Sequence, residues 1–256
     1  MASNTVYTIT GANRGIGLGL VQAYLARPFT TVVAIVRSES TATSLVAAID
    51  KVEIGSQSLL QVVQLDLSKR ATPESVRERF LAVTNNVDHV DTLIYSAGNV
   101  TPMVPTITVT AEQLEESFQV NSIAPLIIFQ ALWPLMDRGA APNTTSPKLF
   151  VLSSSMGSIG GMEPFPGGAY GPSKAAVNHI VKSLHMQMAP LISVAIHPGW
   201  VKTDMGNLVA KEWNYAAGPP DTVEDSVQGI LKVVDEATRD NVSGKFITQT
   251  GAELPW

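Results

Sequence analysis

The sequence contains no cysteine, which excludes disulfide bonds, thiolate metal sites and a cysteine nucleophile. Only 15% of its 256 residues are charged, and the formal net charge of −5 is not typical of a nucleic-acid-binding protein. No apolar run reaches the roughly 18 residues that a membrane-spanning helix needs. The N-terminus lacks the basic and apolar regions of a signal peptide. These absences predict a cytoplasmic protein that binds no nucleic acid, membrane or metal.

A glycine-rich stretch follows the first candidate strand, 6–10. It lacks the Gly-Lys-Ser/Thr ending of a P-loop, so nucleoside triphosphate hydrolysis is not expected. Strand, glycine turn and apolar helical pattern together predict a phosphate-binding crossover, because glycines let main-chain N–H groups approach a pyrophosphate. A glycine-rich turn without a ligand is the alternative. The candidate ligand residues are Gly11, Asn13, Arg14, Gly15, Ile16 and Gly17.

No acidic residue stands at the end of the second candidate strand, 30–36. In dinucleotide-binding folds, Asp or Glu at this place binds the ribose hydroxyls of NAD. Here Arg37 and Ser38 follow the strand, and a guanidinium suits a 2′-phosphate, with Arg14 as a second contact. Either arginine could simply be solvated. The missing acid nevertheless favours NADP(H) over NAD(H).

Polar or small residues also follow the third and fourth candidate strands, 60–65 and 90–95. Asp66 could accept from an adenine amino group or cap the following turn. The small residues after the fourth strand would let the backbone lie against a ribose, or they form an ordinary turn. The candidate cofactor contacts here are Asp66, Leu67, Ser96, Ala97 and Gly98.

The long candidate helix 111–136 carries Asn121 within an otherwise apolar stretch. A buried asparagine needs hydrogen-bond partners. It either supports a water-linked proton path or is a satisfied amide of the core. Both interpretations are compatible with the sequence.

The fifth candidate strand, 148–152, ends in serines, where a parallel sheet presents its ligands, although serines also suit a plain turn. The helix beyond it carries Tyr170 and Lys174, which project from one face because they are four residues apart. An ammonium beside a tyrosine lowers the phenol pKa from its usual value of about 10. The alternative is a packed tyrosine beside a solvated lysine.

The segment 204–222 shows no clear period and predicts a long loop that serves as a lid or binding segment. Its apolar and aromatic residues suit a bulky ketone, and its glycine and prolines at 218–220 suit a hinge. A loop that only covers the sheet or joins a subunit interface is the alternative. The candidate substrate residues are Ser154, Met156, Tyr170, Trp200, Met205, Leu208, Trp213 and Tyr215.

Seven candidate strands alternate with helices along most of the chain. This alternation predicts a single α/β domain with a doubly wound parallel sheet and one ligand crevice. Residues 1–100 would form the nucleotide-binding half, and residues 101–256 the catalytic and substrate half.

Six motifs, in this order, resemble the short-chain dehydrogenase/reductase family over almost the full length of the chain. They are Thr10-Gly11-x-x-x-Gly15-x-Gly17, Ser96-Ala97-Gly98, Asn121, Ser153-Ser154-x-x-Gly157, Tyr170-x-x-x-Lys174 and Pro198-Gly199-x-Val201-x-Thr203. The start Thr5-Val-Tyr, the segment 197–206 and the ending Leu254-Pro-Trp256 are similar to fungal ketoreductases of the norsolorinic acid reductase type. Two features depart from the family pattern: Ser96 stands where the family usually has Asn, and the longer separation of Ser154 from Tyr170 leaves Ser155 as an alternative catalytic serine.

The resemblance implies a Rossmann-like domain, a nicotinamide cofactor and a catalytic set. By resemblance, Tyr170 donates the proton as NADPH reduces a ketone, Ser154 holds the carbonyl oxygen, and Lys174 holds the nicotinamide ribose and lowers the pKa of Tyr170 together with the oxidised ring. Asn121 would hold a water that links Lys174 to solvent. The residues implied to position the carboxamide are Gly199, Val201 and Thr203, and Pro198 is a further candidate cofactor contact.

Two other functions remain compatible with the sequence: alcohol oxidation as the physiological direction, and a catalytically silent NADP-binding regulator. The small-molecule partner is expected to be a ketone. The candidate helix 111–136 and the helix that carries Tyr170 are apolar on more than one side. Together with the resemblance, this predicts a homodimer or homotetramer.

Overall fold

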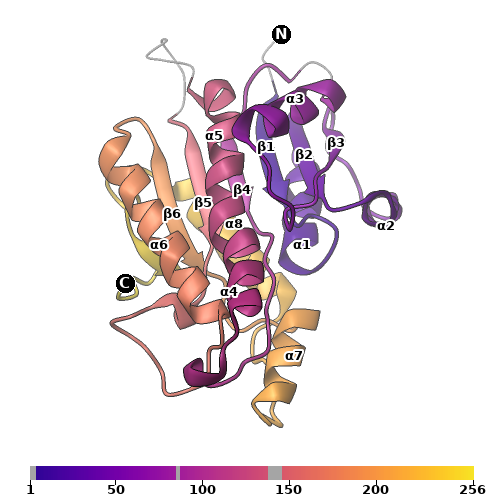
Figure 1. Ribbon diagram of the computed structural model, residues 1–256. Coiled ribbons are helices and arrows are strands. Elements are labelled where there is room, and N and C mark those ends of the chain that lie inside the picture. The colour runs from indigo at the N-terminus through magenta and orange to yellow at the C-terminus, as the bar shows by residue number, and fades with distance from the viewer. Residues whose placement is uncertain (1–3, 85–86, 138–145) are drawn as a thin grey trace.

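Seven parallel strands form the centre of the computed structural model, which describes residues 4–84, 87–137 and 146–256 (Figure 1). The strands are β1 (Thr5–Thr10), β2 (Thr30–Val36), β3 (Leu59–Gln64), β4 (Thr92–Tyr95), β5 (Lys148–Leu152), β6 (Ile192–His197) and β7 (Phe246–Thr248). They lie in the order β3-β2-β1-β4-β5-β6-β7, and every pairing is parallel. The predicted doubly wound sheet is confirmed.

The strand order reverses between β1 and β4, which are neighbours in the sheet but not in the sequence. Thr10 and Tyr95, the last residues of these strands, lie in register. Open parallel sheets bind their ligands outside the carboxyl ends of the strands at such a reversal. The topology therefore places one crevice beside the segments that follow β1 and β4.

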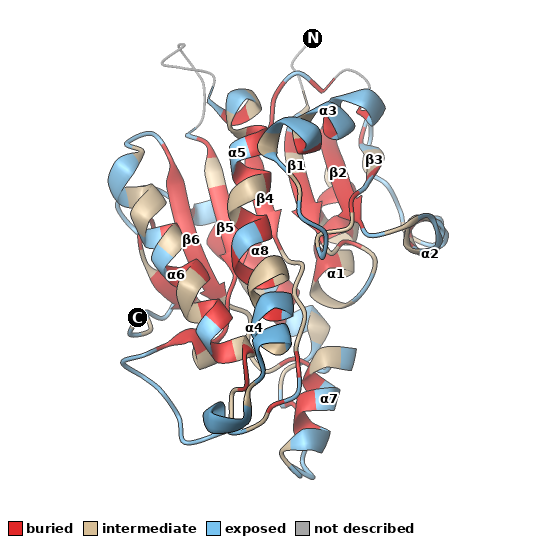
Figure 2. Cartoon of the chain, viewed as in Figure 1, coloured by how far each residue is buried: buried red, intermediate tan, exposed pale blue. Residues whose placement is uncertain are grey.

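Helices cover both faces of the sheet and bury it (Figures 1 and 2). They are α1 (Gly15–Leu25), α2 (Glu39–Ile49), α3 (Pro73–Val83), α4 (Ala111–Phe118), α5 (Ala124–Met136), α6 (Tyr170–Gln187), α7 (Asp204–Glu212) and α8 (Val223–Glu236). Alternate residues of β2 belong to different core clusters: Val33 and Ile35 pack with α3, α5 and α6, and Val32 and Ala34 pack with α1, α2 and α8. All seven residues of β2 are buried, as expected for a strand covered on both faces.

The predicted long helix is present but contains a π-helical segment, Gln119–Ile123, between α4 and α5. Pro125 has no N–H to offer to the carbonyl of Asn121 four residues earlier, so the regular hydrogen-bond pattern is interrupted here. Ala111–Met136 is long and apolar enough to cross a membrane by length and composition alone. However, α5 packs Ile128 and Leu132 into the core against the sheet, which accounts for the apolar residues on that side of the helix.

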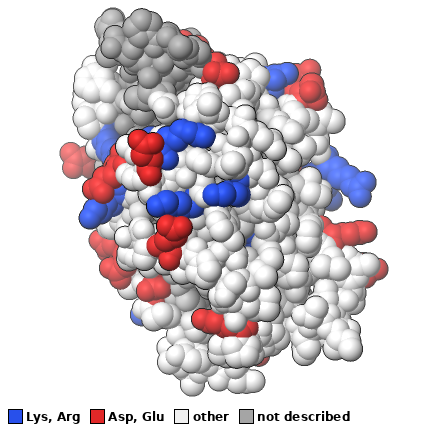
Figure 3. Space-filling view, turned by 90° about the vertical axis from the view of Figure 1, so that its left-hand side faces the viewer, with Lys and Arg blue, Asp and Glu red and all other residues white. Residues whose placement is uncertain are grey.

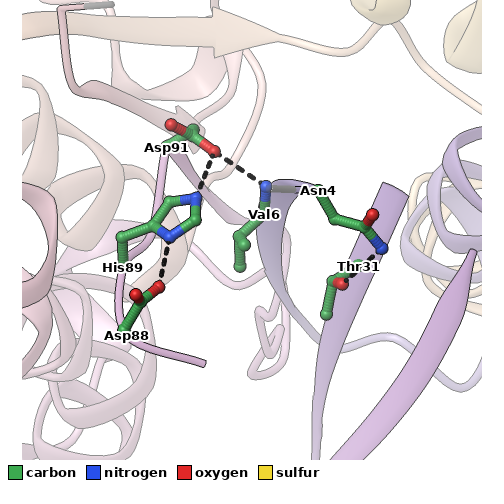
Figure 4. A network of polar contacts seen from close by, with 6 residues as sticks. All are labelled: Asn4, Val6, Thr31, Asp88, His89 and Asp91. Atoms are coloured by element: carbon green, nitrogen blue, oxygen red, sulfur yellow. Dashed lines mark hydrogen bonds and ion pairs between the residues drawn. The ribbon is translucent and has the colours of Figure 1, made fainter. Parts of the chain in front are cut away.

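A polar network ties the beginnings of β1, β2 and β4 together (Figure 4). Asp91 accepts hydrogen bonds from the main-chain N–H of Val6 at 2.8 Å and pairs with His89 Nε2 at 3.2 Å. On the other side, Asn4 donates to the Thr31 hydroxyl at 3.1 Å. These contacts hold the end of the sheet that lies opposite the crevice.

The first half of the segment 204–222 is not the loop that the sequence predicted. Residues 204–212 form α7, whose N-cap Thr203 accepts a hydrogen bond from the N–H of Gly206 at 3.1 Å. Gly206 lies so close to the chain that a Cβ would be 2.1 Å from the Val201 carbonyl oxygen. The glycine that weakens the helical pattern in the sequence is therefore required by tertiary packing.

Candidate active site

Tyr170 and Lys174 lie one turn apart at the start of α6, beside the carboxyl end of β5. Lys174 is only 3% exposed, and its Nζ donates a hydrogen bond to the carbonyl oxygen of Leu152 at 2.7 Å. The same ammonium lies 5.5 Å from the centre of the Tyr170 ring. The sequence-predicted pair is thus assembled at a strand end.

The pKa of Tyr170 is raised in the protein alone, and its expected lowering by Lys174 together with the oxidised nicotinamide ring stays a prediction. Burial raises the pKa of Tyr170 to about 12, and a hydrogen bond with the Ser154 hydroxyl only partly opposes this rise. Burial also lowers the pKa of Lys174 to about 8. Burial therefore dominates both groups, and it leaves Tyr170 as a proton donor rather than a phenolate.

Ser154 is buried at the N-cap of the 3-10 turn Ser155–Gly157 (η3). Its Oγ accepts a hydrogen bond from the N–H of Met156 at 3.2 Å, which fixes the hydroxyl beside Tyr170. For Ser155, the alternative catalytic serine, the main-chain N–H donates to His197 Nδ1 at 3.1 Å. The geometry therefore directs the Ser154 hydroxyl to the phenol.

Buried polar side chains hold the turn that carries Ser154. Ser153 donates to Asn178 Oδ1 at 2.5 Å, and Asn178 Nδ2 donates to the carbonyl of Gly157 at 3.3 Å. Burial lowers the pKa of His197 to about 4, so its Nδ1 remains an acceptor for the turn at neutral pH. These contacts fix the position of the turn after β5 relative to α6.

Asn121 is fully buried, and its amide binds main-chain and side-chain groups of the protein. Oδ1 accepts from the N–H of Asn99 at 3.0 Å, while Nδ2 donates to the Asn99 carbonyl and to Ser173 Oγ, both at 3.0 Å. Both amide protons are thus used within the chain. This is the arrangement expected of a satisfied core amide, and it also joins the segment after β4 to α6.

The glycine stretch forms a closely packed cradle between β1 and α1. Gly11 has φ +65°, and a Cβ there would lie 2.8 Å from Ala97 Cα. A Cβ on Gly17 would lie 2.2 Å from the Gly11 carbonyl oxygen. Thr10 Oγ1 accepts from the N–H groups of Ser96 and Ala97 at 3.1 and 3.0 Å. The segments after β1 and β4 are thereby held side by side.

Residues from distant parts of the chain converge on this cradle. A Cβ on Gly98 would lie 3.4 Å from Asn121 Oδ1 and 3.7 Å from Lys174 Nζ. A Cβ on Gly15 would lie 3.2 Å from Thr203 Cγ2. Predicted cofactor residues from separate segments of the chain therefore lie close to one another, with Gly98 beside Lys174.

The residues predicted to bind adenosine lie at the ends of β2 and β3. Arg37 is exposed, and Ser38 stands at the N-cap of α2, where its main-chain N–H donates to Thr41 Oγ1 at 2.9 Å. Asp66 Oδ1 accepts from the N–H and hydroxyl of Ser68 at 3.0 and 2.6 Å, which lowers the pKa of Asp66, with the positive charge of Arg37 as a smaller contribution. Asp66 thus caps a turn, one of its two predicted roles.

Two predicted cofactor contacts instead have hydrophobic neighbours: Ile16 and Leu67 pack, partly buried, against the two core clusters. Pro198 offers its carbonyl to the Ser226 hydroxyl at 2.6 Å. Gly199 has φ +89° beside Asp221, and Val201 bridges to the same residue. Asp221 thus supports the segment that was expected to position the carboxamide.

Residues 5–213 match the family model of short chain dehydrogenases. The chain belongs to the short-chain dehydrogenase family. The Short-chain dehydrogenase RED3 of Pyricularia oryzae is 38% identical, with all of both chains covered. The Norsolorinic acid ketoreductase of Aspergillus parasiticus is 36% identical, with 98% of this chain and 91% of the relative covered. An NADPH-bound carbonyl reductase from chicken fatty liver matches with TM-score 0.82 and 30% identity over 100% of each chain.

In this short-chain dehydrogenase, aromatic side chains join α7 to the loop between η3 and α6. Trp213 stacks on Phe165, with ring centres 5.0 Å apart, and its Nε1 donates to the Pro166 carbonyl at 3.1 Å. Trp200 contacts both Trp213 and Tyr215, at 5.8 and 5.0 Å between ring centres. Three of the predicted substrate residues are therefore brought together.

The other predicted substrate residues surround this aromatic group less closely. Met205 lies near the crevice, since a Cβ on Gly98 would be 3.9 Å from Met205 Cε. Met156 Cε would lie 2.9 Å from a Cβ on Gly167, so it packs under the loop that leads to α6. Leu208 is 44% exposed on α7.

Sequence reasoning missed four residues that hold this site: Asn99, Ser173, Asn178 and His197. Two of them carried a usable signal. Ser173 lies between Tyr170 and Lys174 in the sequence, and Asn178 follows Lys174 by four residues, hence on the same helix face. Asn99 contacts Asn121 through main-chain groups, which are the same in every residue type, so the sequence gives no signal for this contact.

Metal-ligand clusters are absent from the described part of the chain: no group of three or more His, Asp or Glu side chains there is arranged to hold an ion.

Proposed function

We propose that this short-chain dehydrogenase reduces a bulky, aromatic or polyketide-type ketone to a secondary alcohol with NADPH. The observation that carries the proposal is the contact of protonated Tyr170 with Ser154, beside buried Lys174 and the glycine cradle. Within this arrangement, residues 1–100 serve mainly nucleotide binding and residues 101–256 serve catalysis and substrate binding.

NADP(H) fits the residues that line the crevice. A Cβ at Gly11 or Gly17 would collide with the backbone, so the turn between β1 and α1 is tight. It leads into the N-terminus of α1, where the helix dipole favours the negative charge of a pyrophosphate. Arg37 follows β2 where NAD-binding proteins carry an acid, and a guanidinium complements a 2′-phosphate. The carbonyl reductase that matches at 30% identity is described as NADPH-bound, which supports the same choice.

Three side chains have separate roles in the reduction of the ketone. The nicotinamide, when bound, supplies the hydride for the carbonyl carbon. Tyr170 donates its proton to the carbonyl oxygen, for which a phenol with a pKa of about 12 is in the correct state at neutral pH. Ser154 donates a hydrogen bond to the same oxygen and stabilises its developing charge. Lys174 binds the ribose and holds a positive charge near the phenol.

The substrate lies against the aromatic group formed by Phe165, Trp200, Trp213 and Tyr215. These rings present a large apolar surface, and Tyr215 and Phe165 are about half exposed, at 50% and 49%. Stacking surfaces of this kind favour fused-ring or aromatic ligands. A relative that is 36% identical is named a norsolorinic acid ketoreductase, and this supports an aromatic polyketide-type substrate.

The enzyme is further proposed to act in the cytoplasm as a homodimer or homotetramer through α5 and α6. The segment 117–136 carries no charged residue, and Ile123 is 48% exposed. Figure 3 views the molecule from the α6 side and shows wide areas without charge beside a region of mixed charges. Light scattering at micromolar concentration tests this, and a monomer would contradict it.

Steady-state oxidation of NADPH with a panel of ketones tests the proposed activity. We expect turnover with fused-ring aromatic ketones, weaker turnover with small aliphatic ketones, and at least about a tenfold preference for NADPH over NADH. A protein that binds NADPH but reduces no ketone of the panel would overturn the proposal.

A further inference from the structure

The last residues of the chain turn back along the sheet and reach the active-site side of the molecule. After β7, the N–H of Leu254 donates to the Phe246 carbonyl at 2.8 Å, and Ile247 pairs with Glu253 in antiparallel fashion. Gly251, with φ +85°, makes the reversal possible. The chain end is thereby carried toward the loop that follows Ser154.

Main-chain groups of Pro255 and Trp256 bind this loop directly. The Trp256 oxygen accepts hydrogen bonds from the N–H groups of Ile159 and Gly160 at 3.0 and 2.7 Å. The Pro255 oxygen accepts from the Ser158 hydroxyl at 2.6 Å, and that hydroxyl accepts from the Gly161 N–H at 2.8 Å. The main-chain oxygens of Pro255 and Trp256, the tail, therefore accept hydrogen bonds from three consecutive residues of the loop, 158–160.

Glycines make this close approach possible. A Cβ on Gly160 would lie 3.3 Å from both Pro255 Cβ and the Trp256 oxygen, and one on Gly161 would lie 3.0 Å from Pro255 Cγ. The Trp256 ring is held in turn by Phe246, 5.9 Å away between ring centres, and by Lys182 Nζ, 5.8 Å above the ring. The tail is thus anchored to β7 and α6 before it reaches the loop.

The same loop is also joined to the end of α7. Its other end is held by Trp213, through the hydrogen bond to Pro166 and the stacking on Phe165. The side chains of Ile159, at the first attachment, and of Met162, between the two attachments, are 72% and 70% exposed, which is unusual for side chains of this size. A loop attached at both ends presents these apolar side chains at a fixed distance from Ser154.

We propose that Pro255 and Trp256 are positioning residues for the reductase: they fix the loop 158–166 and thereby set how well the site accepts a large ketone. This inference rests on the proposed function. It assigns the tail no contact with the reacting atoms, because its hydrogen bonds end at Ser158, Ile159 and Gly160. The tail acts on substrate fit rather than on proton transfer by Tyr170.

Deletion of Pro255 and Trp256 from the full chain tests the inference, with two readouts. Hydrogen exchange followed by mass spectrometry should show faster exchange in the peptide that contains Ile159 and Gly160, by about tenfold or more, since their acceptor is lost. The KM for a fused-ring aromatic ketone should rise by about fivefold or more, with kcat/KM for a small aliphatic ketone and the Kd for NADPH within about twofold.

Two further variants keep the test decisive. Ser158→Ala removes the hydroxyl that joins the Pro255 carbonyl to the Gly161 N–H, so it should reproduce the KM effect in weaker form even if the deletion fails to fold. Glu253→Gln changes an exposed tail residue that pairs with Lys245 at 3.3 Å and does not touch the loop. This control should leave both readouts unchanged.

The outcomes separate this inference from the function on which it rests. Unchanged exchange in the deletion, or an equal loss for both ketones together with a lower Tm, would overturn the positioning role. An unmodified protein that reduces neither ketone would overturn the proposed function instead, and the exchange measurement would still decide whether the tail anchors the loop.

Discussion

Arg14 of the glycine loop and Asp204 at the start of α7 form an ion pair of 2.7 Å across the crevice. Their side chains are 66% and 79% exposed, so water screens the attraction. The pair nevertheless connects the proposed cofactor site to the proposed substrate wall. It also occupies the guanidinium that the sequence suggested for a 2′-phosphate.

Asp204→Asn should tighten NADPH binding by about two- to fivefold, because an exposed ion pair contributes about 0.2–1 kcal/mol and its loss frees Arg14 for the cofactor. Fluorescence titration at low and high salt measures this affinity. Glu224→Gln, an exposed acid at the start of α8, is the charge-matched control. Weaker binding in Asp204→Asn would show that the pair holds Arg14 in its binding position.

Arg37→Asp should lower the preference for NADPH over NADH by at least about tenfold, since a hydrogen bond to a charged group contributes about 1.5–3 kcal/mol. The acid would also repel a 2′-phosphate and suit ribose hydroxyls. Values of kcat/KM for both cofactors with one ketone measure the change. Equal use of NADH and NADPH by the unmodified enzyme would contradict the assigned role of Arg37.

Tyr170→Phe should remove nearly all turnover while the Kd for NADPH stays within a few-fold. The substitution deletes the phenolic proton but keeps the ring beside Lys174, so little else is disturbed. Single-turnover kinetics and a parallel cofactor titration check the two parts. Turnover above a few per cent of the unmodified rate would mean that another acid supplies the proton.

Trp213→Phe should raise the KM for a fused-ring ketone and affect a small aliphatic ketone little. The variant keeps an aromatic ring against Phe165 but loses the N–H that holds Pro166. Tyr215→Ala tests the more exposed ring of the same group. If both variants reduce both ketones as well as before, this aromatic group is not the substrate wall.

Lys174→Met should change how stability depends on alkaline pH. Burial lowers the pKa of Lys174 from 10.5 to about 8, so between these values the unfolded chain binds more protons than the folded one. The stability of the unmodified protein should therefore rise with pH in this window, by about 3 kcal/mol relative to Lys174→Met. Urea unfolding at pH 7.5, 9 and 10.5 measures the difference, and parallel curves would contradict it.

The elements of the sheet could be predicted because their signals are local. All seven residues of β2 are apolar or β-branched, and α3 begins at Pro73 after the capping residue Thr72, as expected for a helix start. Spacing also sufficed for Tyr170 and Lys174, since four residues on a helix always share a face. The sequence alone thus determined the fold class, the element order and the identity of the proposed proton donor.

Only the tertiary structure decided how these elements act on one another. The helix α7 was missed because Gly206 weakens its pattern, and the need for glycine arises from the turn at Val201 and from Pro219, which packs against this position from beyond the helix. The pKa of Tyr170 is raised because the side chain is buried, and the spacing of residues in the sequence gives no information on burial. Main-chain contacts such as those of Asn99 and Trp256 form between residues far apart in the chain. Because main-chain groups are the same in every residue type, such contacts could not be predicted from the sequence.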